Sequence, residues 1–437
     1  MSRPGEDAPG PAVAGLSAAE PPVALATVLR EWGRIGCIGF GGPPAHIRLL
    51  RQLCVERRGW LDAREFEDAI AVCNLMPGPA STQLAIFCAW RLRGRAGALV
   101  GGGAFIIPGL IIILALSVLF VASSPPLWVL GAGAGAGAAV PAVAVQAGWS
   151  LLRPSWRNRA SGVRWVVYLA AGLAAAATIG AWLVLVLVGC GVIELVARYG
   201  PDLSGRAARG GRPDDGDGGD ERDGGLREGN GNGGGERDGG GTRLHGFLAA
   251  PAFVLAVGGG VLASVAWVAF KVGALSFGGG FVIIPLMQAD AVSRYHWMTG
   301  AQFLNAVALG QVTPGPVVQT VAVVGYAAAG LAGGLLASAV AFTPSFLIVL
   351  FGGPRFQRIR ADQRARAFLD GAGPAAIGAI LGSAVTLTRE LTHPWQYAVL
   401  AGALVSLLPL RRGVVLTLLA AAAIGVTIVL AAGTGSP

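Results

Sequence analysis

The stretch Asn74-Leu-Met-Pro-Gly-Pro-Ala-Ser-Thr-Gln83 interrupts an apolar segment, and a second version follows far downstream as Gln311-Val-Thr-Pro-Gly-Pro-Val-Val-Gln-Thr320. A proline cannot donate to the hydrogen-bond ladder of a helix, and it clashes with the preceding turn. Each Pro-Gly-Pro therefore ends one helix and lets another begin. We expect two pairs of half-helices, each pair broken in the middle of a hydrophobic run.

The two halves of the chain align without gaps around these breaks, at an offset of 237 residues. Both copies also carry a capping-box pattern, which starts a helix, ahead of the break. The matched motifs are Gly36 with Gly273, Phe40-Gly-Gly42 with Phe277-Gly-Gly279, Trp60 with Trp297, Asp62-Ala-Arg-Glu65 with Thr299-Gly-Ala-Gln302, Phe66 with Phe303, and Phe105 with Phe342. The sequence thus predicts one unit repeated as residues 22–200 and 246–437.

Two segments lie outside the repeated unit. Residues 1–21 are rich in Ala, Pro and Gly and lack the charged-then-apolar order of a cleaved signal peptide. Residues 201–245 mix glycine with Asp, Glu, Arg and Asn, so they cannot bury enough apolar surface to fold. We expect a disordered N-terminal tail and a flexible linker between the repeats.

The composition is that of a membrane protein. Hydrophobic residues make up 54% of the chain and charged residues 13%, whereas soluble domains carry about 25% charged residues. Uncharged runs at 97–122, 127–152, 331–354 and 413–437 exceed the ~20 apolar residues that cross a bilayer as a helix. The net charge of +9 lies mostly in short loops between such runs, which argues against a nucleic-acid partner. We predict an all-α polytopic membrane protein in contact with the lipid bilayer.

The arginine-rich loops orient the two copies. In the first copy the basic loops are 48–58, 91–95 and 153–164, whereas residues 123–126 carry no charge. In the second copy the segment that corresponds to 123–126 is the arginine-rich loop 355–366. Since basic loops remain in the cytoplasm, the two repeats should have inverted topology, as is common in secondary transporters.

The same rule applies to the broken segments. The loops before and after residues 66–90 are both basic, so this segment should leave and return on one side of the membrane. We predict that residues 66–90 and 303–326 are re-entrant hairpins of two half-helices. Exposed backbone at membrane depth is tolerated only where it is buried in protein or lines a wet cavity.

The half-helices suggest an anion site. A helix N-terminus presents unpaired N–H groups and the positive end of the helix dipole, and glycine lets backbone approach a ligand closely. The alternative is that these glycines and prolines only allow tight helix packing. The predicted anion-binding residues are Gly41, Gly42, Pro77, Gly78, Pro79, Ser81, Thr82, Gln83, Gly278, Gly279, Pro314, Gly315, Pro316, Gln319 and Thr320.

Charged side chains near these motifs extend the hypothesis. Arg34 aligns with Lys271, the only lysine of the chain. Intramembrane ionisable groups mark ion pathways by default, and two cations would balance a divalent anion; alternatively, both snorkel to the interface. Asp68 aligns with Asn305, so it is titratable in one copy only, which suits proton coupling; alternatively, it stabilises a helix start. His46 is a second proton-coupling candidate or a satisfied interfacial histidine.

Other chemistries find no support in the pattern. The five cysteines show no metal-ligand spacing, so we expect no metal site and no cofactor. A nucleotide-binding GxxxxGK[ST] loop is missing from the sequence, which argues against ATP as the driving force. No convergent nucleophile and acid–base set indicates an enzyme. The sequence leaves a homo-oligomer open.

The motifs resemble the chromate ion transporter family. The first copy carries Gly39-Phe-Gly-Gly-Pro-Pro-Ala-His-Ile47, Trp60-Leu-Asp62 and the first Pro-Gly-Pro, and the second carries Ser276-Phe-Gly-Gly-Gly-Phe281 and the second Pro-Gly-Pro. The pair resembles the long-chain, two-domain members. This resemblance implies an inner-membrane carrier that exports chromate, draws on the proton gradient and confers resistance. A carrier of sulfate, which has the shape and charge of chromate, and a passive anion channel remain the alternatives.

Overall fold

The computed structural model describes residues 23–121, 125–157, 159, 161–178, 183–209, 260–276, 281–352 and 363–432. Within these residues every regular element is helical, which confirms the all-α prediction. The first half contains α1 (Leu25–Ile38), α2 (Pro43–Arg51), the π-helical turn η1 (Gln52–Arg57), α3 (Ala63–Leu75), α4 (Ala80–Phe120), α5 (Leu127–Arg157), α6 (Gly162–Thr178) and α7 (Leu183–Arg209). The second half contains α9 (Val261–Leu275), α10 (Ile283–Gln288), the π-helical turn η3 (Ala289–Arg294), α11 (Gly300–Val312), the 3₁₀ turn η4 (Val317–Gln319), α12 (Thr320–Gly352), α14 (Gln363–Arg389), α15 (Pro394–Leu407) and α16 (Val414–Ala432).

The elements repeat in the register that the sequence predicts. The π-helical turns η1 and η3 occupy equivalent positions, as do α3 and α11. Each of these two helices starts at a capped residue: Asp62 accepts from the Arg64 N–H, and Thr299 accepts from the Gln302 N–H in a complete capping box. Both Pro-Gly-Pro segments interrupt the helices, because α3 ends before the first and α11 before the second.

The two longest helices double back on themselves. In α4 the backbone leaves helical geometry at Arg93 and Gly94, and α12 does the same at Ala329 and Gly330. A Cβ on Gly101 would lie 2.4 Å from the Cβ of Ala89, although a continuous helix would separate these residues by about 18 Å. Residues 80–92 thus form a short helix that folds back against residues 95–120, with the turn in the basic loop 91–95.

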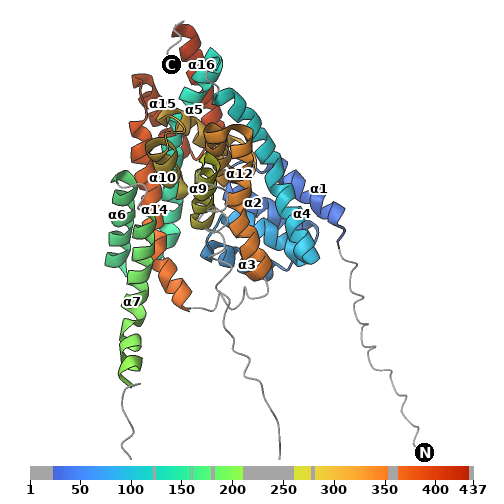
Figure 1. Cartoon of the computed structure of the whole chain (residues 1–437), viewed down its shortest axis with the longest axis vertical. Helices are drawn as coiled ribbons and strands as arrows, with labels where there is room; N and C mark the ends of the chain where they lie inside the picture. The colour runs from blue at the N-terminus through green and yellow to red at the C-terminus, as the bar shows by residue number, and fades with distance from the viewer. Residues whose placement is uncertain are drawn as a thin grey trace, which may run out of the picture.

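The repeats interlock around α4 and α12. Gly102 of α4 lies against Phe346 of α12, and Leu114 lies against Gly334, so the two helices run antiparallel. Helix α5 of the first repeat packs on α15 and α16, while its equivalent α14 packs on α6 and α7. Figure 1 shows α1 to α4 on one side of the molecule and α6, α7 and α14 on the other. These contacts are the ones expected if an approximate two-fold rotation relates the two halves.

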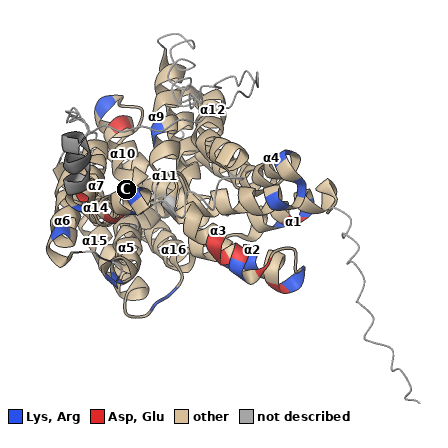
Figure 2. Ribbon diagram, turned by 90° about the horizontal axis from the view of Figure 1, so that it is seen from below, with Lys and Arg blue, Asp and Glu red and all other residues tan. Residues whose placement is uncertain are grey.

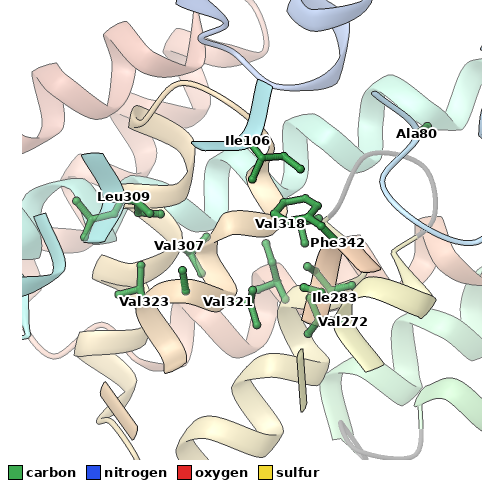
Figure 3. Close-up of a cluster of buried hydrophobic side chains, with 14 of the residues drawn as sticks. Ala80, Ile106, Val272, Ile283, Val307, Leu309, Val318, Val321, Val323 and Phe342 are labelled. Carbon is green, nitrogen blue, oxygen red and sulfur yellow. The ribbon is translucent and has the colours of Figure 1, made fainter. Parts of the chain in front are cut away.

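Large apolar side chains lie both inside and on the surface. Figure 3 shows Ile106 of α4 close to Val318, with Val272, Ile283 and Phe342 nearby, so the core is shared between the repeats. Within the described part of the chain, five helices are long and apolar enough to cross a membrane by length and composition. These five are Ala80–Phe120, Leu127–Arg157, Val317–Gly352, Gln363–Arg389 and Val414–Ala431. Charged residues gather instead on α1, α2, α3 and the start of α4 (Figure 2).

Several predicted segments fall outside the described residues. They include the N-terminal tail 1–21, most of the linker 201–245, and the second Phe-Gly-Gly with Gly278 and Gly279. Helix α7 continues to Arg209, so it extends into the start of the segment assigned to the linker.

Candidate functional site

Each Pro-Gly-Pro lies against the other repeat. The N–H of Gly78 donates to the carbonyl oxygen of Ser276 at 3.1 Å, and the N–H of Gly315 donates to that of Gly39 at 3.1 Å. Gly78 is equivalent to Gly315 and Gly39 to Ser276, so the two bonds are mates under the two-fold rotation. Each break is therefore completed by the chain that leaves the first helix of the opposite repeat.

The central glycine of each break is required by its backbone. Gly78 has φ +119° and Gly315 has φ +99°, a region that side chains strongly disfavour. A Cβ on Gly78 would also lie 2.4 Å from the Gln83 Nε2 and 3.0 Å from the Ser345 Oγ. The first break is thus enclosed by its own half-helix and by α12 of the second repeat.

The second break has its close contacts at other residues. A Cβ on Gly109 of α4 would lie 2.1 Å from the carbonyl oxygen of Pro314. The Gln319 Nε2 donates to the carbonyl oxygen of Ile106 at 2.6 Å, and Gly42, with φ +73°, faces Val317. Backbone and amide groups therefore lie close to Pro314 and Gln319, whereas a Cβ on Gly315 itself would meet nothing nearer than 3.5 Å.

Buried polar atoms without a hydrogen-bond partner in the described residues gather near the two breaks. Native proteins leave few such groups, and each needs an explanation. Six of the eight are Thr82 Oγ1, Gln83 Oε1, Ser276 Oγ, Gln311 Nε2, Gln319 Oε1 and Ser345 Oγ, and the other two are Arg164 Nε and Asp290 Oδ1. The hydroxyls can donate to an anion. The free glutamine atoms at 83 and 319 are oxygens, which accept, because their nitrogens already donate to backbone carbonyls.

His46 connects the two breaks. Its ring is fully buried, with Nε2 at 2.8 Å from the Gly39 carbonyl oxygen and Nδ1 at 3.3 Å from the Ser81 Oγ. A carbonyl oxygen only accepts, so Nε2 carries the hydrogen and Nδ1 accepts from Ser81 in the neutral ring. Gly39 in turn accepts from Gly315. His46 thus positions the first turn of one half-helix relative to the other break.

The two predicted cations have different surroundings. Arg34 is exposed and has no ion pair among the described residues. Lys271 is mostly buried and lies 2.5 Å from the Asp290 Oδ2, with 18% and 3% of the two side chains exposed. Sequence reasoning missed Asp290, whose equivalent in the first repeat is Leu53. The sequence did contain a signal for this residue: Asp290 is a single carboxylate in the apolar run that follows Lys271, the only lysine.

The acidic residues of α3 are engaged at its surface. Glu65 pairs with Arg91 and Glu67 pairs with Arg51 at 3.3 Å. Because Arg91 lies near the end of the first half-helix of α4, its bond to Glu65 links that end to the start of α3. Asp68 lies half-buried on the same helix.

Two cavities flank the core at related positions. One, of about 360 Å³, has Asn74 and Leu275 in its wall, and these residues precede the two partners of the Gly78–Ser276 bond. The other, of about 310 Å³, is bordered by Asn305, Glu390 and His393. Equivalent positions line both: Ser155 and Thr392, Arg159 and Gln396, Asp370 and Gly133, and Pro374 and Gly137.

Comparison with known proteins agrees with this architecture. A chromate transport protein of Cupriavidus metallidurans is 29% identical over 410 residues, which cover 92% of each chain. A probable chromate transport protein of Synechococcus elongatus is 26% identical, over 85% of this chain and 87% of its own. No solved structure matches the chain. The family model described as chromate transporter matches residues 26–195 and 263–426. The apolar helices are those of a multi-pass membrane protein. Because the family match takes in both repeats and more than half of the sequence, the chain belongs to the chromate transporter family.

Proposed function

We propose that this protein is a secondary carrier that exports chromate, a tetrahedral divalent oxyanion, across the cytoplasmic membrane and thereby confers chromate resistance. The observation that supports this proposal best is the pair of hydrogen bonds between the repeats, from Gly78 to Ser276 and from Gly315 to Gly39. They bring two half-helix N-termini and buried hydroxyls to the interface between the repeats. Helix ends of this kind favour anions.

The mechanism is alternating access by inverted repeats. Its support is the antiparallel contact of α4 with α12: these are equivalent helices, so if both cross the bilayer, the axis that relates them lies in the membrane plane. The two cavities, at related positions on either side of the core, would serve as alternate entrances. In such carriers the substrate site lies at the interface between the repeats.

Proton coupling is assigned to Asp68 or His46. Asp68 is half-buried at the start of the broken segment. His46 could take up a proton at Nδ1, and its bond to Ser81 would then reverse, with the ring donating and the hydroxyl accepting. Arg34, which is exposed, is the cation more readily available to the anion, because the charge of Lys271 is already compensated by Asp290.

Uptake of labelled chromate into inside-out membrane vesicles tests the proposal. A carrier accumulates chromate when the vesicles are energised, and accumulation collapses when a protonophore is added. Inhibition of chromate uptake by excess sulfate reports whether sulfate and chromate share the carrier. Flux that follows the electrical potential alone and is unchanged in Asp68→Asn would identify a channel instead. Arg34→Ala and Lys271→Ala decide whether either cation takes part.

A further inference from the structure

We infer that the oxyanion binds at only one of the two breaks, the one built on Gly78. There the oxyanion is bound by the first turn of α4 and by three neutral hydroxyl groups, those of Thr82, Ser276 and Ser345. This inference rests on the proposed function and specifies its binding site. Neither serine is among the anion-binding residues predicted from the sequence: Ser276 only precedes the second Phe-Gly-Gly, and Ser345 lies in neither motif.

The three hydroxyls belong to residues that lie next to Gly78 in the chain or in space. The Ser345 Oγ lies 3.0 Å from where a Cβ of Gly78 would be. Ser276 bonds to the Gly78 N–H through its carbonyl oxygen, and Thr82 lies in the first turn after the break. Each side chain is buried, with 0–2% of the residue exposed, and none of the three hydroxyl oxygens has a partner among the described residues. An oxyanion would supply the missing acceptors.

The helix end adds backbone donors. Helix α4 begins after Pro79, and the N–H groups of Thr82 and Gln83 bond back to the Pro79 carbonyl oxygen. The N–H groups of Ala80 and Ser81 come first in the helix and have no intrahelical acceptor. They carry the positive end of the dipole. A donor set of hydroxyl and backbone N–H groups binds a tetrahedral dianion without a neighbouring cation.

The second break lacks this set. The positions equivalent to Ser276, Ser345 and Thr82 are Gly39, Pro108 and Gln319, none of which carries a hydroxyl. The nearest atom to a Cβ built on Gly315 is the Gln319 Oε1, at 3.5 Å, and a carbonyl oxygen cannot donate to an anion. The two breaks thus have related backbone arrangements, but the side chains around them differ.

The first break also has an approach from outside. The cavity of about 360 Å³ is bordered by Asn74 and Leu275, which lie next to the first break and to Ser276. Its outer wall includes Ser155 and Arg159, which belong to the basic loop 153–164 that we predict to be cytoplasmic. An exported anion would enter the site from this side.

The test measures anion binding and stability in the same purified, detergent-solubilised protein. The melting temperature of the wild type and of Ser345→Ala, Ser276→Ala and Thr82→Val is recorded in potassium chromate, sulfate, phosphate and chloride at matched ionic strength. Ser117→Ala is the matched control, because Ser117 is equally buried on α4 but bonds to the Ile113 carbonyl oxygen at 2.7 Å.

We expect chromate and sulfate to stabilise the wild type, as any ligand of the native state does. Each site variant should bind chromate about ten- to a hundredfold more weakly, the effect of losing a hydrogen bond to a charged group. Without chromate, Ser345→Ala should melt at the same or a higher temperature, because the lost hydroxyl had no partner. Ser117→Ala should keep the wild-type affinity.

Two outcomes overturn different claims. If the wild type is stabilised by chromate and the three variants keep its affinity, the site at Gly78 is wrong while the proposed function stands. If no tetrahedral dianion stabilises the wild type and its vesicles accumulate no chromate, the proposed function fails and the site falls with it. A lowered melting temperature of Ser345→Ala without chromate, at unchanged affinity, would assign the hydroxyl to the fold.

Discussion

Position 290 is one of the places where the two repeats differ in buried charge. Asp290 and its partner Lys271 are buried in the second repeat, whereas the equivalent residues in the first are Leu53, which is buried, and Arg34, which is exposed. The π-helical turn is the same in both repeats. Helices α9, α10 and α11 hold no charged residue besides Lys271. The first repeat therefore forms this turn without a buried ion pair at the equivalent positions.

Removing one partner of the pair should be far more costly than removing both. Asp290→Asn leaves the Lys271 ammonium buried and uncompensated, and such changes lower the free energy of unfolding by about 3–5 kcal/mol. The double variant Lys271→Met, Asp290→Leu should have a free energy of unfolding close to that of the wild type, because the first repeat forms the same turn with Leu53 in place of Asp290. Thermal unfolding of the purified variants measures both effects. Chromate uptake by the double variant then tests Lys271 directly: transport lost from a stable double variant would make this lysine part of the anion pathway.

Gly78 offers a second test at the level of one side chain. Gly78→Ala places a Cβ in the disfavoured backbone region and 2.4 Å from the Gln83 Nε2. We expect at least a tenfold loss of chromate uptake with the protein still present in the membrane. Gly402→Ala is the control, because a Cβ there meets nothing within 4 Å. Equal uptake by both variants would contradict a site at the first break.

At the scale of elements, local chemistry made much of the fold predictable. The Pro-Gly-Pro breaks, the capped starts of α3 and α11 and the turn at 91–95 all follow from backbone rules that act within a few residues. The repeat was visible because one register holds through both copies. The residues at the first break were found in part, since Gly78 and Thr82 belong to the motif.

Contacts between distant residues were not predictable from one sequence. Nothing local states that Gly78 bonds to Ser276 rather than to its own repeat, or that Ser345 faces the break. Asp290 was missed because its role depends on a lysine of another helix. The π-helical turns have no sequence signature comparable to a capping box. These features are set by tertiary packing, which single-sequence patterns do not encode.

Helix α16 tests whether glycine contacts join the repeats. A Cβ on Gly425 would lie 2.1 Å from the carbonyl oxygen of Gly131 in α5, a close approach typical of membrane helices. Gly425→Ala should lower the stability by about 1–3 kcal/mol, because overpacking forces the helices apart. Gly189→Ala on α7, where a Cβ meets nothing within 4 Å, should cost much less. Melting temperatures of the two variants in detergent make the comparison, and equal values would rule out a tight α5–α16 contact.

At the scale of the whole molecule, the antiparallel contact of α4 with α12 and the loop charges lead to the same arrangement. The basic loops 48–58 and 153–164 belong to the first repeat. The basic loop of the second repeat, 355–366, corresponds to the uncharged residues 123–126 and not to either of these loops. A two-fold axis in the membrane plane sends equivalent loops to opposite sides. The two π-helical turns, which end in exposed arginines, give the sharpest comparison.

Arg57 and Arg294 are equivalent, both exposed, and both the last residue of their turn. In a background with Cys37, the exposed native cysteine, changed to serine, Arg57→Cys should react with a membrane-impermeant maleimide only in inside-out vesicles. Arg294→Cys should react only in intact spheroplasts. Unlabelled buried cysteines in the parent protein serve as the control. Labelling of both positions from one side would show parallel repeats, and alternating access by inversion would then have to be abandoned.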